Sequence, residues 1–283
     1  MTGGSGFIGS RMLQRLPYEV LNFDLSKWMD LRDRQQTARY IGEFRPDVIL
    51  HFAAKSIVSE SVRCPDETYE TNVIGTLNLL DAMKKHGVQT LIFSSSASVY
   101  GNATHCPIRE EEPLVPVSPY GKSKAIIESI LSDYAKYVRS ISLRYFNVTG
   151  PHEHHNPETH LVPLVIKALM QGDEIPVYGD DFDTPDRTCI RDYVHIDDVI
   201  DANLLAIDNR HKFECESFNI GTGKGTSVSE VVNTISALLE KEPRFKFMHP
   251  RSGDVAQLVC DPLKANIELG WIPKRDPFSW ISQ

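Results

Sequence analysis

Short apolar segments rich in β-branched residues alternate with amphipathic helical segments through the first half of the 283-residue chain. Because a helix between two strands returns the chain to the start of the next strand, this order predicts a parallel sheet covered by helices on both faces. We therefore expect a doubly wound α/β fold. The segments typical of strands are 18–24, 47–54, 90–96 and 140–147, and those typical of helices are 65–86 and 119–138.

The character of the sequence changes after Gly150. Proline, glycine, histidine and aspartate become frequent in segments without periodicity. One clear helix remains at 228–240, where Ser227 and Glu230 have the spacing of a capping box. We expect a first domain at 1–150 and a second, smaller α/β region at 151–283.

Composition and charge exclude several classes of protein. A net charge of −8 and a pI near 5.7 argue against nucleic acid or an anionic membrane as the main partner. No apolar run approaches the ~20 residues of a membrane span, and no charged-then-apolar leader begins the chain. The five cysteines are scattered and form no CxxC pair. This pattern favours reduced thiols and a cytoplasmic location over a disulfide framework or a zinc site.

One segment contains several histidines, His152, His154 and His155. Histidines at this spacing can bind zinc, but a polar loop holds them in no fixed geometry. We interpret the segment as a solvated loop and expect no metal cofactor.

The chain begins with a glycine turn, in which Gly3, Gly6 and Gly9 have the spacing of a dinucleotide-binding motif. Glycines let the backbone turn tightly and approach a pyrophosphate. An acidic residue about 20 positions later is expected to bind the adenosine ribose. Asp24 has this position, and its carboxylate favours NAD over NADP because it repels a 2′-phosphate. The glycines alone would also fit a flexible terminus, but together with Asp24 they predict an NAD site.

The dinucleotide motif also requires a strand before the glycine turn, and here only Met1 precedes Thr2. Either the true start lies upstream or the sheet lacks its central strand. A missing central strand would expose the core and disrupt the dinucleotide site, so we expect a truncated or misplaced start.

A pair of polar residues lies near the start of the predicted helix at 119–138. Ser118 suits an N-cap and Pro119 suits the first turn. Tyr120 and Lys124, four residues apart, then share one helix face. A nearby ammonium favours tyrosinate and lowers the pKa of the phenol, which makes Tyr120 a candidate general base. Such pairs are also common on exposed helices, so the pair alone leaves a solvated face as an alternative.

Taken together, the motifs resemble a known family. With His51-Phe52-Ala53-Ala54, the segment 94–101 and Arg144-Tyr145-Phe146-Asn147, they closely resemble the extended short-chain dehydrogenase/reductase family, and within it the UDP-glucose 4-epimerases. The resemblance runs from Thr2 to about Trp271. It implies a Rossmann-like fold in which 1–150 bind NAD and 151–283 bind a sugar nucleotide. It also implies a homodimer.

The chemistry implied by this resemblance is hydride transfer at C4 of a UDP-sugar. Tyr120 would take the proton of the 4-hydroxyl while the hydride passes to NAD, giving a transient 4-keto sugar that regains the hydride on its opposite face. Lys124 would hold the nicotinamide ribose and lower the pKa of Tyr120. Ser96 would bind the 4-oxygen. The implied activity interconverts UDP-glucose and UDP-galactose, or their N-acetyl analogues.

The resemblance also implies a set of cofactor contacts. Asp30 and Leu31 match the pair that contacts adenine, although the segment between Asp24 and Asp30 is much shorter than in typical relatives. Asn72 matches an asparagine on the next helix. The implied cofactor-binding residues are Gly3, Gly6, Phe7, Ile8, Gly9, Asp24, Asp30, Leu31, Phe52, Ala53, Ala54, Asn72, Tyr120 and Lys124.

On the substrate side, the resemblance implies that arginines bind the diphosphate and that a carboxylate binds the uridine ribose. Guanidinium groups suit phosphate oxygens, which would let an acidic protein hold a dianionic nucleotide. His160 stands where the family usually has asparagine. The implied substrate-binding residues are Ser96, Tyr120, Asn147, His160, Leu161, Arg191, Arg251 and Asp254.

Two other interpretations stay open. A sugar-nucleotide 4,6-dehydratase or decarboxylase also begins by oxidising C4. Those enzymes need an additional acidic residue near the serine, and Ser96-Ala97-Ser98 has none. A catalytically idle protein that binds NAD or a sugar nucleotide would keep the motifs without turnover.

Overall fold

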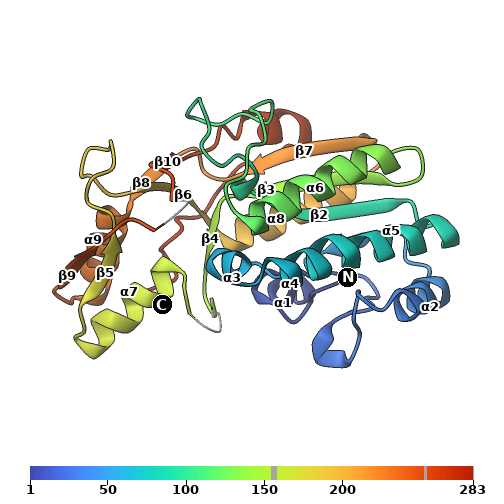
Figure 1. Cartoon of the computed structure of the whole chain (residues 1–283), viewed down its shortest axis with the longest axis horizontal. Helices are drawn as coiled ribbons and strands as arrows, with labels where there is room; N and C mark the ends of the chain where they lie inside the picture. Colours follow the sequence, from blue (N-terminus) through green and yellow to red (C-terminus); the bar gives the residue numbers. More distant parts are fainter. Residues whose placement is uncertain (154–157, 252–253, 283) are drawn as a thin grey trace.

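The computed structural model describes residues 1–153, 158–251 and 254–282. A parallel sheet flanked by helices fills most of the molecule, and a smaller α/β unit lies at one end (Figure 1). This architecture confirms the predicted Rossmann-like α/β fold. The main sheet contains, in spatial order and all parallel, β1 (Ile49–His51), β2 (Thr90–Ser96), β3 (Arg139–Tyr145) and β7 (Cys215–Ile220).

Helices cover both faces of the main sheet, as predicted. Successive strand residues point to opposite faces, so Leu91 belongs to one apolar layer and Ile92 to the other. The Leu91 layer contains residues of α2 (Arg34–Phe44), α5 (Gly75–His86) and α6 (Pro119–Tyr134), and the Ile92 layer contains residues of α1 (Phe7–Leu13) and α8 (Ile196–Asp208).

Residues 1–3 take the position of a central strand. Thr2 forms parallel bridges with both Phe23 and His51, and its N–H donates to the carbonyl of Leu50 at 2.9 Å. The strand predicted at 18–24 is reduced to a bridge at Phe23, because few residues run beside it. A hollow of about 440 Å³ is lined in part by Met1 and Leu21.

The helix predicted at 65–86 contains one wide turn. A π-helical turn at Glu70–Ile74 joins α4 (Pro65–Tyr69) to α5, and Asn72 within it is buried. The predicted strand at 140–147 is divided into β3 and β4 (Asn147–Thr149). A further short helix, α3 (Val58–Arg63), precedes α4 and packs against α6.

The second part of the chain has more regular structure than predicted. The capping box of Ser227 and Glu230 at the start of α9 (Val228–Leu239) is confirmed. The expectation of one clear helix after residue 150 is wrong, because α7 (Leu161–Gln171) and α8 are also present. Pro163 and a nearly continuous apolar run hide the helical period of α7. The other elements of this part are β5 (Ile175–Tyr178), β6 (Ile190–His195), β8 (Gly225–Ser227), β9 (Phe245–Met248) and β10 (Gln257–Leu258).

We searched the described residues for a helix that combines the length and the apolarity needed to cross a membrane, and found none there.

Candidate functional site

The predicted catalytic residues lie at the edge where the parallel strands end. β2 ends at Ser96, which is in register with Tyr145 at the end of β3. Phe52 directly follows β1 at the same edge. Ligands of open parallel sheets bind at the carboxyl ends of the strands. The sheet therefore presents this edge as the candidate site.

The start of α6 positions Tyr120 at this edge. The Ser118 hydroxyl accepts a hydrogen bond from the Gly121 N–H at 3.1 Å, which confirms the predicted N-cap. A Cβ atom on Gly121 would lie 2.4 Å from the carbonyl oxygen of Ser98. Glycine at position 121 is thus needed for the close approach that brings Tyr120 to Ser96. The Tyr120 N–H donates a hydrogen bond to the Ser61 hydroxyl at 3.1 Å.

Lys124 is buried one turn further along α6. Its ammonium donates to the carbonyl oxygen of Ser94 at 2.7 Å and lies 5.8 Å from the centre of the Tyr120 ring. Burial lowers the pKa of Lys124 to about 7, and the charge of Glu128 opposes that effect. The alternative of a solvated Tyr/Lys face therefore does not hold, since Lys124 is 2% exposed.

The pKa of Tyr120 differs from the expectation. Burial raises it, because the phenolate is charged, and a hydrogen bond with the Ser96 hydroxyl acts in the opposite direction. Lys124 was expected to lower this pKa, but its ammonium is bonded to Ser94 and is itself destabilised by burial. Tyr120, Lys124 and Ser96 are brought together as predicted.

The glycine turn has the form that a dinucleotide requires. Gly3 has φ +70°, and a Cβ atom there would lie 2.5 Å from the Ala53 nitrogen. A Cβ on Gly9 would lie 2.2 Å from the carbonyl oxygen of Gly3, whereas one on Gly6 would meet nothing closer than 3.4 Å. Gly3 and Gly9 thus allow tight packing, and the backbone at Gly6 stays open to a pyrophosphate. Phe7 and Ile8 begin α1 and pack against the core.

Asp24 faces the glycine turn. Its carboxylate accepts hydrogen bonds from the N–H groups of Ser5 and Ser26, each at 2.9 Å. Burial raises the pKa of Asp24, but these hydrogen bonds outweigh it and the pKa is lowered overall. An ionised carboxylate next to the turn fits the ribose of an adenosine.

Asp30 and Leu31, the two residues predicted to contact adenine, form contacts with neighbouring residues. Arg32 donates from Nη2 to the Asp30 carboxylate at 2.7 Å and lowers its pKa. Leu31 is buried in the apolar layer of α5, and its carbonyl accepts from Asn78 at 2.9 Å. In this arrangement, Leu31 contributes to packing.

Asn72 fixes the loop that follows β1. Its side-chain oxygen accepts from the Lys55 N–H at 2.8 Å, and its amide donates to the Lys55 carbonyl and to the Ser123 hydroxyl. The segment Phe52-Ala53-Ala54 is thereby held between the glycine turn and α6. The sequence analysis missed Ser61 and Ser123, because nothing in their local pattern shows that they join segments far apart in the chain.

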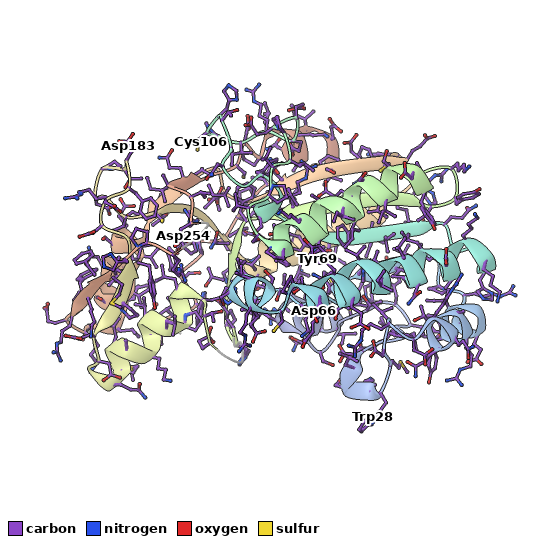
Figure 2. The ribbon with its side chains drawn as sticks, in the orientation of Figure 1. Trp28, Asp66, Tyr69, Cys106, Asp183 and Asp254 are labelled. Carbon is purple, nitrogen blue, oxygen red and sulfur yellow. The ribbon has the colours of Figure 1, made fainter. Side chains whose placement is uncertain are left out.

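Arg191, Arg251 and Asp254 meet in the smaller unit, where Asp254 is labelled in Figure 2. Arg191 donates from Nη1 to the carbonyl of Val255 at 2.8 Å, and Arg251 donates from Nε to Asp254 at 3.1 Å. Burial raises the pKa of the Cys189 thiol, and Arg191, Asp254 and Arg251 all act on that thiol. The two predicted phosphate-binding arginines therefore contact adjacent residues of one segment, Val255 and Asp254. The Arg251 guanidinium also stacks on Tyr178 at 4.7 Å, a contact with no local sequence signal.

The other predicted substrate residues connect the smaller unit to the sheet edge. Asn147 begins β4, which pairs with β6 two positions beyond Arg191. His160 is the N-cap of α7 and Leu161 its first residue, and both are half-buried. Asn147 therefore lies on the strand next to that of Arg191, and His160 and Leu161 lie at the start of α7.

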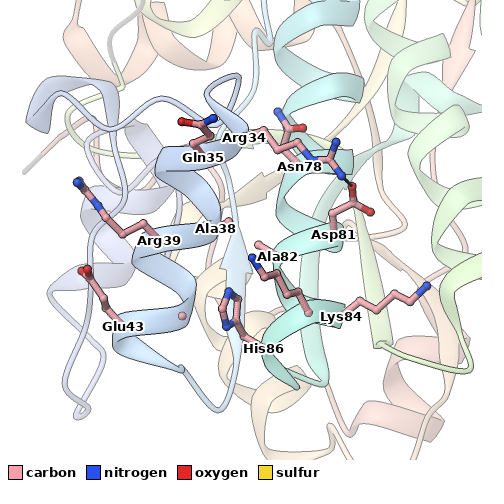
Figure 3. A pocket seen from close by; sticks show the side chains of 12 residues that line it. Arg34, Gln35, Ala38, Arg39, Glu43, Asn78, Asp81, Ala82, Lys84 and His86 are labelled. Atoms are coloured by element: carbon pink, nitrogen blue, oxygen red, sulfur yellow. Dashed lines mark hydrogen bonds and ion pairs between the residues drawn. The ribbon is translucent and has the colours of Figure 1, made fainter.

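The large hollow between α2 and α5 does not belong to this site. His154 and His155 lie outside the described residues, and the described parts contain no group of three potential ligands that could hold a metal ion. A hollow of about 930 Å³ lies between α2 and α5, with Arg34 and Asp81 paired across it (Figure 3). None of its lining residues is a predicted site residue.

A Rossmann-like sheet, a glycine turn with an ionised aspartate, and a Tyr–Ser pair next to a buried lysine together define a dinucleotide-dependent enzyme of the hydride-transfer class. Residues 1–221 match the model of the NAD dependent epimerase/dehydratase family. The chain belongs to this family.

Similar proteins span almost the whole chain. The UDP-glucose 4-epimerase of Halalkalibacterium halodurans is 38% identical over 97% of this chain and 90% of its own length. The crystal structure of UDP-glucose 4-epimerase from Brucella ovis in complex with NAD has a TM-score of 0.91 at 38% identity, covering 99% of this chain and 94% of that one. The enzyme from Bifidobacterium longum in complex with NAD+ and UDP has a TM-score of 0.90 at 34% identity, over 99% and 95%.

Proposed function

We propose that this chain is an NAD-dependent UDP-sugar 4-epimerase that interconverts UDP-glucose and UDP-galactose, or their N-acetyl analogues. The observation that carries the proposal is the group of Tyr120, Ser96 and the buried Lys124, which lies at the sheet edge next to the glycine turn. Relatives that match nearly the whole chain are UDP-glucose 4-epimerases, which supports the same activity.

The residues around the glycine turn would hold the cofactor. Gly6 leaves room for the pyrophosphate, Asp24 would bind the adenosine ribose, and Lys124 the nicotinamide ribose. When bound, NAD supplies the hydride acceptor for C4 of the sugar and returns the hydride to the opposite face.

Tyr120 is the proposed acid and base. As the phenolate, Tyr120 would take the proton of the sugar 4-hydroxyl and become a phenol, which would give the proton back once the keto sugar has rotated, while Ser96 holds the 4-oxygen in line. Both side chains are close enough for a hydrogen bond between them, so they can contact the same oxygen. The ammonium of Lys124 would stabilise the phenolate that forms during the transfer.

We further propose that residues 151–283 carry the sugar-nucleotide site and 1–150 the NAD site. Arg191 and Arg251 would bind the diphosphate, with Asn147, His160 and Leu161 nearby, and Asp254 would bind the uridine ribose. Their contacts with the adjacent residues Val255 and Asp254 support the assignment of the arginines.

Product analysis tests the activity. Purified protein with NAD should convert UDP-glucose to UDP-galactose, and a parallel assay with UDP-N-acetylglucosamine measures the acceptance of acetamido sugars. Tyr120→Phe should lower kcat by about 10² to 10⁴-fold while NAD binding is kept, because general acid–base catalysis contributes on that order. Tyr137→Phe, at an exposed tyrosine beyond the end of α6, is the matched control.

Other products would contradict the proposed activity. A stable 4-keto-6-deoxy sugar indicates a dehydratase, and released carbon dioxide indicates a decarboxylase. Neither turnover nor a burst of NAD reduction indicates an idle binding protein. Full activity in Tyr120→Phe would remove Tyr120 as the base.

We also propose a homodimer that acts in the cytoplasm. Ile126 on α6 and Val62 on the adjoining α3 are 41% and 60% exposed, and an interface there would bury them. Light scattering should then give twice the 31.9 kDa of one chain. A mass of one chain at micromolar concentration would contradict the dimer.

A further inference from the structure

Three residues on one face of α6 are held by three consecutive serines of β2. The Ser94 carbonyl accepts from Lys124, the Ser95 hydroxyl donates to Glu128, and the Ser96 hydroxyl acts to lower the pKa of Tyr120. Tyr120, Lys124 and Glu128 follow each other at intervals of one helical turn. The proposed chemistry uses the first two residues and leaves Glu128, a buried carboxylate, without a role.

Glu128 is fixed in place from two neighbouring strands. Arg144 on β3 donates from Nε to Oε1 at 3.1 Å and from Nη2 to Oε2 at 2.6 Å. Ser95 on β2 adds a hydrogen bond to Oε1. Both members of the ion pair have side chains that are 7% exposed. The Glu128 carboxylate is therefore fixed in place, one helical turn from Lys124 in α6.

A buried ion pair of this kind is a poor device for stability. The cost of removing two charges from water offsets most of their attraction, and apolar residues of similar size often stabilise a core as well. Arg144 also donates from Nη1 to the Tyr100 hydroxyl at 2.8 Å and to the Glu110 carbonyl at 3.0 Å. Tyr100 and the Glu110 carbonyl thus hold the Nη1 group of Arg144, while its Nε and Nη2 groups hold the Glu128 carboxylate.

The charged and titratable groups around Lys124 point to an electrostatic role. On β1, His51 is buried and its pKa is lowered to about 3, so it brings no charge at neutral pH. On α6, Tyr120 is neutral, because burial raises its pKa. On β2, the groups facing Lys124 are the Ser94 carbonyl and the ring of Phe93 at 4.7 Å. On β3 lies Arg144, already paired with Glu128.

We propose that Glu128 is a positioning residue for the reaction: its fixed negative charge keeps Lys124 in the cationic form beside Tyr120. The inference rests on the proposed function of Tyr120 and Lys124. Burial alone drives Lys124 toward the neutral amine, and Glu128 opposes this. Without the carboxylate, Lys124 would lose its proton at a lower pH and could no longer stabilise a phenolate.

Direct titration of Lys124 tests this inference without any substrate. Protein labelled with ¹³C at the lysine side chains is followed by NMR between pH 5 and 10, and Lys124→Arg identifies the signal. In Glu128→Gln we expect the titration midpoint of Lys124 to fall by about one pH unit or more, as the loss of an adjacent opposite charge requires. The alkaline limb of kcat/KM should move to lower pH by a similar amount.

Two further variants separate charge from structure. Glu128→Asp keeps the charge, so the Lys124 midpoint should stay close to that of the parent even where Tm falls. Asp133→Asn removes an exposed carboxylate from the same helix and should change neither the midpoint nor the pH profile. If Glu128→Gln does not fold, the double variant Glu128→Gln/Arg144→Gln leaves no unpaired buried charge and should still lower the midpoint.

An unchanged Lys124 midpoint in the Gln variants, with only a lower Tm, would overturn the inference and leave Glu128 a structural residue. Failure of the proposed function gives a different result: the Lys124 midpoint moves as expected, but the parent protein does not epimerise UDP-sugars.

Discussion

Burial raises the pKa of the Tyr120 phenol and the Ser96 hydroxyl lowers it, and burial has the larger effect. A phenol in such surroundings keeps its proton unless a positive charge is close when the proton moves. Lys124 is the cation placed for this purpose, with its ammonium 5.8 Å from the tyrosine ring. The competence of Tyr120 as a base therefore depends on whether Lys124 is charged.

On the substrate side, Arg251 is the proposed partner of the diphosphate. Arg251→Ala should raise the KM for the UDP-sugar about 10- to 100-fold, because a hydrogen bond from a charged donor contributes about 1.5–3 kcal/mol. The change in kcat should be smaller, since the diphosphate lies away from the reacting carbon. Steady-state kinetics with both UDP-hexoses measure the two constants.

A nearby arginine provides the control for Arg251. Arg244→Ala removes an exposed guanidinium that pairs with Glu174 on the outside of the smaller unit, and it should leave KM unchanged. Arg251→Lys should recover only part of the affinity, because lysine lacks the planar fork that matches a diphosphate. Equal KM values for Arg251→Ala and the parent would show that Arg251 does not contact the substrate.

At the scale of elements, the sequence predicts what is decided locally. The start of α6 follows from Ser118 and Pro119, and that of α9 from Ser227 and Glu230, because capping involves residues three positions apart. The glycine turn is equally local. Its conformation needs a residue that accepts φ +70° at Gly3.

Elements that depend on distant partners could not be predicted in the same way. Residues 18–24 have the apolar pattern of a strand, yet their pairing depends on Met1–Gly3 alongside. The helix α8 begins with Ile196-Asp197-Asp198 and most of its residues are buried, so its position depends on the layers that it packs against. The role of Asn72 depends on Lys55 and Ser123, which are brought to it by the fold.

The same dependence explains which parts of the candidate site were found. Tyr120, Lys124, Ser96 and the glycines belong to contiguous motifs, and the structure brings them together. Tyr178 stacks on Arg251 from a strand far away in sequence, and no local pattern marks it. Glu128 does follow Lys124 at helical spacing, but its partner Arg144 lies on another element.

On the scale of the whole molecule, the chain crosses between its two parts more than once. β7 comes from the second part, yet it pairs with β3 in the main sheet. α8 packs against α1 in the same apolar layer. α1 and the elements β7 and α8 from the second part of the chain therefore share one core, and Arg11 of α1 pairs with Asp197 of α8 at 2.7 Å.

His51 joins several of these parts at the centre of the fold, which makes it a determinant of acid stability. Its Nδ1 bonds with the Thr2 hydroxyl at 2.6 Å and its Nε2 with the Thr76 hydroxyl at 2.8 Å. Burial, with smaller contributions from Lys124 and the chain N-terminus, lowers the pKa of His51 from 6.5 to about 3. The unfolded chain therefore binds a proton below pH 6.5 that the folded protein refuses until about pH 3.

Because protonation of His51 favours the unfolded chain, the free energy of unfolding should fall as the pH drops from 6.5 toward 3. His51 should contribute up to about 1.4 kcal/mol per pH unit. His51→Gln keeps a donor and an acceptor for Thr2 and Thr76 but does not titrate, so its stability should fall less steeply over this range. Urea unfolding at several pH values measures both slopes. His211→Gln removes an exposed histidine and should follow the parent. If the His51→Gln and parent curves run parallel, the protonation of His51 does not contribute to the loss of stability at low pH.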